Sequence, residues 1–267
     1  MTPDLNDMKR WIVFFVIFLL LIAGCSDQYA SRRKFHLYLL AGQSNMAGRG
    51  KVEEQDKQPH PRVFALNQEG QWQLATEPLH FDKPGAGVGP GLAFGKAMAE
   101  HKKHVRIGLI PCAAGGSPIS SWTQGGYHSQ TKSHPYDDTI RRAKIAMQSG
   151  VIKGIIWHQG ESDSKPELAQ VYQAKLEELI ANFRRELGDD DLPFVVGKLG
   201  DFYVARNPNA ESINNILERI PLTVKNTACA DTAGLTPKSD LTHFNAESAR
   251  ELGRRDAELM IKLEQGD

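Results

Sequence analysis

A serine near the N-terminus and an aspartate and a histidine near the C-terminus are side chains that could together carry out acyl transfer. Ser44 lies in the segment Gly42–Gly48, directly after the apolar run 35–40, and Asp240 precedes His243 by three residues in a polar stretch. A serine hydroxyl becomes an effective nucleophile when a base accepts its proton, and a carboxylate can orient that base. The order serine, aspartate, histidine therefore predicts Ser44 as nucleophile, His243 as base and Asp240 as its orienting acid.

The sequence also contains a second candidate base among its nine histidines. His158 follows the apolar run 151–157 and would lie at the end of a strand, as Ser44 does. Only Glu161 or Asp163, in the following turn, could orient its ring. The sequence favours His243, because its carboxylate partner is nearby on the same loop, and His158 stays the alternative.

Acyl transfer also needs hydrogen-bond donors that face the oxyanion of the tetrahedral intermediate. The backbone N–H of Ser44 is one candidate, since it comes with the turn that carries the nucleophile. The glycine-rich turn 113–117 offers a second, from either Gly115 or Gly116. The side-chain amide of Gln159 offers a third.

Strands and helices alternate along most of the chain, and these elements must position the reactive groups. Repeated βα units with short turns predict a parallel sheet with helices on both faces. Every candidate above follows a predicted strand, so all should gather at the carboxyl edge of the sheet. The pattern predicts strands at 35–40, 63–67, 105–111, 151–157, 194–199 and 222–229, and helices at 92–100, 136–149, 166–187, 210–218 and 246–263, the last with Asn245 as N-cap.

Length and charge limit the classes of partner. A chain of 267 residues suits one domain with a sizeable core. Its 32 basic and 32 acidic residues give a pI near 7.1, so no overall field favours nucleic acid or an anionic membrane. The composition therefore points to a neutral small molecule or a polymer and argues against nucleic acid.

The N-terminal segment has the pattern of an export signal. Lys9 and Arg10 precede the apolar run Trp11–Ala23, which is shorter than the ~20 residues of a membrane-spanning helix. The run leads into the segment 21–25, Leu-Ile-Ala-Gly-Cys, which resembles the bacterial lipobox, where cleavage exposes a cysteine that is lipidated. An uncleaved signal anchor is the alternative.

These features predict an exported bacterial lipoprotein, held by acyl chains on Cys25 to a membrane of the cell envelope, on the periplasmic face or the cell surface. The expected organisation is a signal peptide at 1–24, a tether at 25–34 and a single catalytic domain at 35–267. Two further cysteines, Cys112 and Cys229, are compatible with a disulfide or with two separate buried thiols.

Several motifs together resemble a known family. The chain is similar to the SGNH-type hydrolases and, more narrowly, to the sialate O-acetylesterase and acetylxylan esterase group known as carbohydrate esterase family six. The matching blocks are spread over nearly all of the sequence after the signal, at 42–50, 88–90, 111–117, 157–163 and 240–245.

The resemblance implies an α/β fold of the flavodoxin-like kind, a three-layer α/β/α sandwich with a five-stranded parallel sheet, and a mechanism without metal or cofactor. It assigns the nucleophile to Ser44, the base to His243 and the orienting acid to Asp240. It also implies an oxyanion hole formed by the amides of Ser44 and Gly116 with the side chain of Gln159. The wider superfamily has asparagine at this last position, whereas the narrower family shares the glutamine.

The resemblance further implies that the substrate is an acetate ester of a sugar or polysaccharide, of the sialate or acetylxylan type. Trp122 could present its ring to a sugar or merely anchor its loop. Glu161 and Arg49 are expected to organise the site through hydrogen bonds. The alternatives are a lipase, thioesterase or arylesterase of the wider superfamily, and a catalytically silent glycan-binding lipoprotein.

Overall fold

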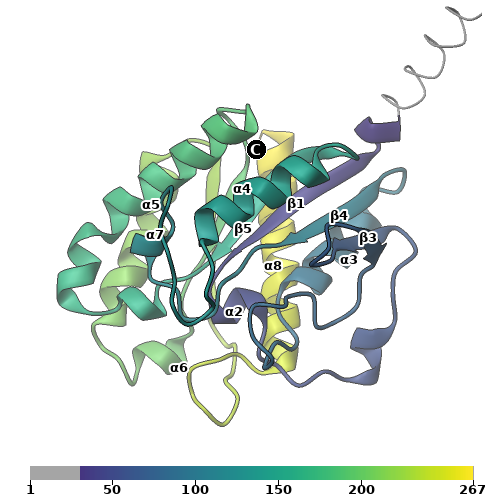
Figure 1. Ribbon diagram of the computed structural model, residues 1–267. Helices are drawn as coiled ribbons and strands as arrows, with labels where there is room; N and C mark the ends of the chain where they lie inside the picture. Colours follow the sequence, from purple (N-terminus) through teal and green to yellow (C-terminus); the bar gives the residue numbers. More distant parts are fainter. Residues whose placement is uncertain (1–30, 267) are drawn as a thin grey trace, which may run out of the picture.

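One seven-stranded sheet runs through the centre of the computed structural model, which describes residues 31–266 (Figure 1). The strand order is β3-β2-β4-β1-β5-β6-β7, and all neighbours are parallel except β2 and β3. The central strand β1 pairs with β4 on one side and β5 on the other, so its carboxyl end lies in the middle of the sheet edge. The strands are β1 (Phe35–Gly42), β2 (Val63–Leu66), β3 (Trp72–Leu74), β4 (Arg106–Pro111), β5 (Val151–His158), β6 (Phe194–Gly197) and β7 (Thr227–Ala230).

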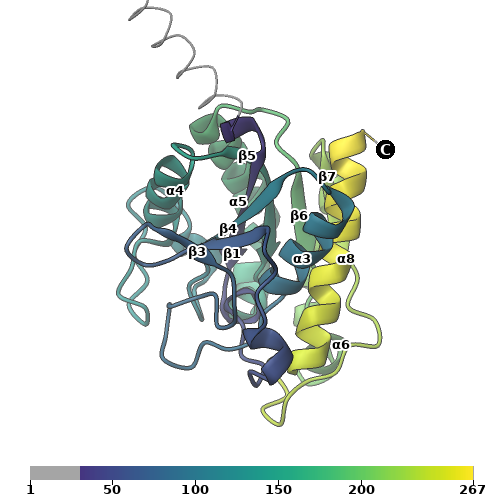
Figure 2. The same cartoon turned by 90° about the vertical axis from the view of Figure 1, so that its right-hand side faces the viewer.

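Helices cover both faces of this sheet. One face packs against α4, α5 and α7, and the other against α3 and α8 (Figure 2). The side chains of β1 alternate accordingly, with Leu37 and Leu39 in the first core and Tyr38 and Leu40 in the second. The helices are α2 (Ser44–Ala47), α3 (Gly91–His101), α4 (Pro135–Ala146), α5 (Pro166–Leu187), α6 (Asp201–Val204), α7 (Ala210–Thr223) and α8 (Ala246–Gln265), with 3₁₀ turns η1 (Glu54–Lys57), η2 (Ile119–Ser121) and η3 (Glu161–Asp163).

The predicted three-layer α/β/α class is confirmed, whereas the five-stranded sheet implied by the resemblance is wrong. All six strands expected from the sequence pattern are present in the sheet. The seventh, β3, pairs antiparallel with β2 at the sheet edge after a turn at Asn67–Gly70. Its three residues are too few to show the alternation by which a strand is recognised in sequence.

One element boundary differs markedly from the prediction. The segment 222–229 was expected to be a strand, but α7 continues to Thr223 and β7 begins only at Thr227. Leu217 and Ile220 extend the buried face that Ile213 begins, so burial of that face carries the helix onward despite Pro221 in its last turn. Asn245 is the N-cap of α8 as predicted, and its side chain accepts a hydrogen bond from the Ser248 N–H at 2.9 Å.

Both described cysteines are free thiols. Cys112 follows β4 and Cys229 lies in β7, four strands away in the sheet. At a strand spacing of about 4.8 Å, this separation is far beyond the reach of a disulfide. The two residues are therefore separate thiols, the second of the two sequence-based alternatives.

The predicted signal, tether and lipidated Cys25 lie largely outside the described residues. Within residues 31–266, none of the helices combines the length and the apolar character needed to cross a bilayer.

The exit of β1 is fixed by a close approach between two backbones. Gly42 pairs with His158 of β5 and has a φ of +132°. A Cβ atom at this position would lie 2.1 Å from the His158 carbonyl oxygen, which also accepts a hydrogen bond from the Gln43 N–H at 2.9 Å. Only glycine lets the chain turn here, so that Ser44 directly follows the sheet edge.

We expect Gly42→Ala to destabilise the domain by at least about 1–3 kcal/mol, because the added methyl group overlaps a backbone that cannot move aside. The matched control is Gly85→Ala, where a Cβ atom would meet nothing within 4 Å. Urea denaturation midpoints should fall for the first variant and stay near the wild-type value for the control. Equal midpoints for all three proteins would contradict the assigned contact.

Candidate active site

The structure brings Ser44 and His243 together from opposite ends of the chain. Ser44 begins α2 immediately after β1, and His243 lies in the loop before α8, at the same end of the molecule (Figure 1). The Ser44 Oγ and His243 Nε2 atoms are 2.9 Å apart, and His243 Nδ1 is 2.9 Å from Asp240 Oδ2. Ser44 is 9% exposed, so the residue is largely shielded from solvent.

Asp240 organises its own loop as well as the imidazole. Its Oδ1 atom accepts hydrogen bonds from the N–H groups of Thr242 and His243, each at 2.9 Å, while Leu241 between them takes a φ of +53°. Partial burial opposes ionisation of Asp240, but the hydrogen bonds from the His243 ring and from the two backbone N–H groups outweigh it and hold the pKa of this carboxyl well below its usual range. The carboxylate is thus ionised at neutral pH and fixes the ring orientation.

Asn45, which the sequence did not single out, holds the histidine loop from the nucleophile side. Its Nδ2 atom donates to the Thr242 carbonyl at 3.2 Å and to Glu161 Oε1 at 2.5 Å, and its Oδ1 atom accepts from the Phe244 N–H at 3.1 Å. One amide therefore binds the backbone on both sides of His243. Because Asn45 adjoins Ser44, this contact sets the distance between nucleophile and base.

His158, the alternative base, is placed elsewhere. It is 1% exposed, packs edge-on against Phe244, and its ring nitrogens have no hydrogen-bond partner among the described residues. Its Nε2 atom lies 3.8 Å from Glu161 Oε1. Burial lowers the pKa of His158 to about 4 and raises that of Glu161 to about 7. The hydrogen bond from Ser44 goes to His243, so the structure favours the first candidate.

The hydrogen bonds of the glycine-rich turn differ between its two candidate oxyanion donors, the N–H groups of Gly115 and Gly116. The Gly115 N–H donates to Asp82 Oδ2 at 2.8 Å and is therefore already engaged. Gly115 is buried, whereas the next residue, Gly116, is partly exposed. Of the two amides, the structure leaves that of Gly116 for a ligand.

Gln159 is placed differently from the sequence-based expectation. The residue is fully buried, and its Nε2 atom lies 3.1 Å from Gln43 Oε1, 3.0 Å from the Ser117 carbonyl and 2.5 Å from Asp163 Oδ2. An amide nitrogen has only two hydrogens, and three protein acceptors already surround it. Gln159 therefore links the segment before Ser44 to the end of the glycine-rich turn, rather than pointing an open donor at Ser44.

Asp82 and Arg49 form a second link between these segments. The guanidinium of Arg49 donates to Asp82 at 2.8 Å and to the Gly48 carbonyl at 2.7 Å. Asp82 in turn holds Gly115. Arg49 and Glu161 both have the organising contacts expected of them, but no sequence motif marked Asp82.

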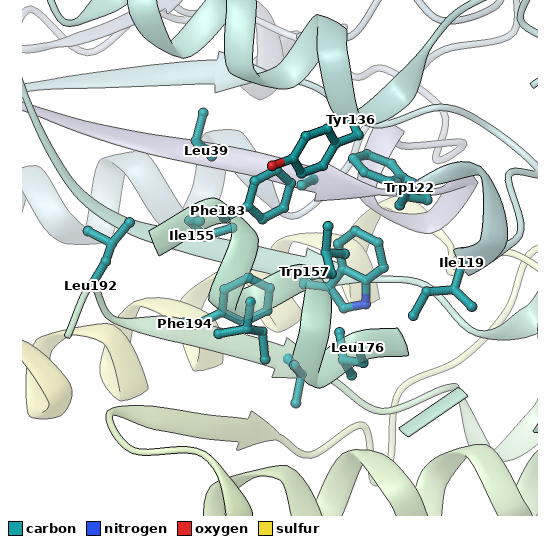
Figure 3. Close-up of a cluster of buried hydrophobic side chains, with 14 of the residues drawn as sticks. Leu39, Ile119, Trp122, Tyr136, Ile155, Trp157, Leu176, Phe183, Leu192 and Phe194 are labelled. Carbon is teal, nitrogen blue, oxygen red and sulfur yellow. The ribbon is translucent and has the colours of Figure 1, made fainter. Parts of the chain in front are cut away.

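Trp122 does not have the sugar-facing position considered for it. It is 1% exposed and packs edge-to-face on Trp157 at 4.9 Å between ring centroids, inside the core that also contains Tyr136 and Phe183 (Figure 3). Its Nε1–H donates to Ser117 Oγ at 2.9 Å. The ring is closed to solvent, so a role as an exposed platform is wrong and Trp122 instead anchors its loop.

These contacts define what the arrangement can do chemically. The imidazole of His243 can accept the Ser44 proton at Nε2, because its Nδ1 side is held by an ionised carboxylate. The Ser44 hydroxyl is hydrogen-bonded to this Nε2 atom at 2.9 Å. This arrangement is suited to nucleophilic attack on a carbonyl carbon.

The buried Glu161 gives a testable pH dependence. With its pKa raised to about 7, the folded protein binds this proton more tightly than the unfolded chain, so the Glu161 contribution to stability falls as pH rises from about 4.5 to about 7. Glu161→Gln should remove that fall, so the variant should gain on the order of 3 kcal/mol relative to wild type across this range. Urea unfolding at several pH values measures the difference, with the exposed Glu167→Gln as control. Parallel stability curves for Glu161→Gln and wild type would contradict the assignment.

Comparison with known proteins identifies the family. Residues 34–262 match the family described as carbohydrate esterase, sialic acid-specific acetylesterase. The chain is 33% identical over 239 residues to a probable carbohydrate esterase of Arabidopsis thaliana, covering 81% of this chain and 86% of the relative. A crystal structure of a protein from Arabidopsis thaliana is similar with a TM-score of 0.75 and 30% identity, covering 85% of this chain and 98% of the other.

A carbohydrate acetylesterase from Xanthomonas citri shares the fold, with a TM-score of 0.66 at 23% identity over 86% of this chain and 57% of the other. The family match spans nearly all of the described residues and includes every segment that borders Ser44 and His243. The chain therefore belongs to the carbohydrate esterase family of sialic acid-specific acetylesterases, has the SGNH-type fold, and is a carboxylic ester hydrolase.

Proposed function

We propose that this esterase removes O-acetyl groups from carbohydrates through a covalent acetyl-enzyme on Ser44. The observation that carries the proposal is the continuous hydrogen-bonded series from Asp240 through His243 to Ser44, with 2.9 Å at both steps. The family membership supports a carbohydrate acetate as substrate. The relative from Arabidopsis thaliana, itself a probable carbohydrate esterase, supports the same class.

In the first half-reaction, His243 Nε2 takes the Ser44 proton as Oγ bonds to the acetyl carbonyl carbon. The tetrahedral intermediate then collapses, the bond to the sugar oxygen breaks, and the His243 imidazolium returns the proton to that oxygen. In the second half, His243 removes a proton from water as the water oxygen bonds to the acetyl carbon. The bond from that carbon to Ser44 Oγ then breaks, the imidazolium returns the proton to Oγ, and acetate leaves. Asp240 stays ionised throughout and stabilises the imidazolium.

The oxyanion donors in this proposal are the N–H groups of Ser44 and Gly116. Ser44 is the first residue of α2, and the first N–H groups of a helix have no partner within it. Gly116 is supported by the engagement of its neighbour Gly115 with Asp82. Loss of one such donor typically costs about 2.7–4 kcal/mol in the barrier. Gln159 contributes by fixing the two segments that carry these amides.

Ser44→Ala should abolish acetate release from an acetylated sugar, with a loss of about 10⁶ in turnover, because the covalent step has no nucleophile. The exposed Ser212→Ala on α7 is the matched control and should retain full activity. Acetate release is measured directly, and wild type should also be labelled covalently at Ser44 by an organophosphonate. Undiminished turnover by Ser44→Ala would end the proposal, whereas glycan binding without labelling would favour a silent binding protein.

The same assay separates a carbohydrate acetylesterase from the broader lipase, thioesterase or arylesterase alternative. Acetyl and octanoyl esters of one alcohol are compared as rival substrates. The proposed function expects a higher kcat/KM for the acetyl ester, and a preference for the octanoyl ester would favour the alternative.

We further propose that Cys25 carries a lipid anchor that holds the exported enzyme at a membrane of the bacterial cell envelope. The support is the sequence of residues 9–25. Labelled palmitate supplied to the native host should be incorporated into wild type and into the control Cys229→Ala but not into Cys25→Ala, because a lipobox cysteine is the acylated residue. Equal labelling of Cys25→Ala and wild type would show that the anchor is wrongly assigned.

A further inference from the structure

A pocket of about 240 Å³ lies beside the candidate active site, at the carboxyl end of β4, and is called the β4 pocket here. Cys112, Ala113 and Ala114 form part of its wall, together with Phe81, Asp82 and Arg142. Because β4 pairs directly with β1, the residues that follow β4 and line this pocket lie next to the strand that leads into Ser44. The Ala114 N–H also donates to the Gly42 carbonyl, which joins the pocket wall to the nucleophile segment.

The carboxylate of Asp82 connects the β4 pocket to the candidate active site. Its side chain is 3% exposed, and its Oδ2 atom binds both Arg49 and the Gly115 N–H. Its Oδ1 atom is buried and has no hydrogen-bond partner among the described residues. A buried carboxylate oxygen without a donor is unfavourable, so a ligand with an O–H or N–H group would be stabilised beside it.

Arg142 supplies the complementary donor. It is 5% exposed, and one of its terminal nitrogens donates to the Leu66 carbonyl at 2.9 Å and the Asn67 carbonyl at 3.2 Å. Its Nε atom has no hydrogen-bond partner among the described residues. The guanidinium lies 4.5 Å from the centroid of the Phe81 ring, which is 41% exposed and also lines the pocket.

The charges around the pocket balance. Asp82 and Asp138 oppose Arg141 and Arg142 in the lining. His80 also lines it, and burial lowers its pKa to about 4, so that its ring is neutral at pH 7. A lining without net charge suits a neutral ligand better than an anion or a cation.

The lining thus combines an unpaired acceptor, an unpaired donor and a partly exposed aromatic ring. A hydroxyl group both donates and accepts, so it can satisfy Asp82 and Arg142. The carbon–hydrogen face of a pyranose can cover an aromatic ring. These are the complementary groups of a neutral sugar.

We propose that the β4 pocket is a second sugar subsite, which binds a neutral pyranose unit next to the unit whose acetyl group reaches Ser44. This inference rests on the proposed function and narrows its substrate class to acetylated oligosaccharides or polysaccharides. Phe81 is then a specificity-determining residue for the longer substrates. Asp82, shared by the pocket and the Gly115 amide, aligns the bound chain with the glycine-rich turn.

The test compares acetylated xylotriose with singly acetylated xylose, using wild type, Phe81→Ala and the remote control Leu222→Ala. Phe81 and Leu222 are both exposed, so neither substitution threatens the fold. Wild type and Leu222→Ala should have a higher kcat/KM for the trimer than for the monomer. Phe81→Ala should raise KM for the trimer about three- to tenfold, with kcat/KM for the monomer unchanged. Equal use of both substrates by wild type, or an equal loss on both by Phe81→Ala, would overturn the subsite.

A binding measurement separates this inference from the catalytic proposal. Titration calorimetry of xylotriose with Ser44→Ala measures subsite affinity without turnover, and Ser44→Ala combined with Phe81→Ala is the comparison. The subsite predicts weaker binding by the double variant, whether or not Ser44 proves to be the nucleophile. Identical affinities for the two proteins would overturn the subsite and leave the proposed function intact.

Discussion

The hydrogen bond between Ser44 and His243 joins two segments 199 residues apart, and most of the architecture around it serves to set its length. On one side, the close contact of Gly42 with β5 fixes where the chain leaves the sheet. On the other, α8 begins three residues after His243, and a Cβ atom at Gly50 would lie only 2.7 Å from the Ala246 Cα. The start of α8 therefore rests directly on the segment that follows the nucleophile. Asn45 completes the connection by binding the backbone on both sides of the base.

The ionisable groups of the site differ in how deeply they are buried, and their pKa values differ accordingly. Asp240, 39% exposed, carries the charge that supports His243, whereas the deeper His158 and Glu161 are shifted by burial toward their neutral forms. Glu161 binds the side chain of Asn45, which adjoins the nucleophile, whereas the carboxylate that holds the imidazole lies partly exposed.

Much of this arrangement is predictable from sequence because its determinants are local. Asp240 and His243 lie three residues apart, and Ser44 directly follows an apolar strand, so the sequence pattern and the geometry of the strand edge suffice to bring them together.

Asp82 could not be found this way, because its partners Arg49 and Gly115 are 33 residues distant on either side and no motif surrounds it. The full burial of Gln159 and Trp122 could not be predicted for a related reason. Each follows a strand or turn at the active edge, but burial depends on packing from α5 and neighbouring loops, which residue type does not reveal. The edge strand β3 was missed because its formation depends on pairing with β2.

The two separate thiols have a consequence for where the domain can exist. Burial raises the pKa of Cys112 to about 11 and that of Cys229 to about 12, so neither forms the thiolate that oxidants attack at neutral pH. With both described cysteines unpaired, the folded domain gains nothing from an oxidising environment and loses nothing in a reducing one. Between residues 31 and 266, packing, hydrogen bonds and ion pairs hold the fold without a cysteine cross-link. This part of the fold therefore does not depend on the machinery that forms disulfides.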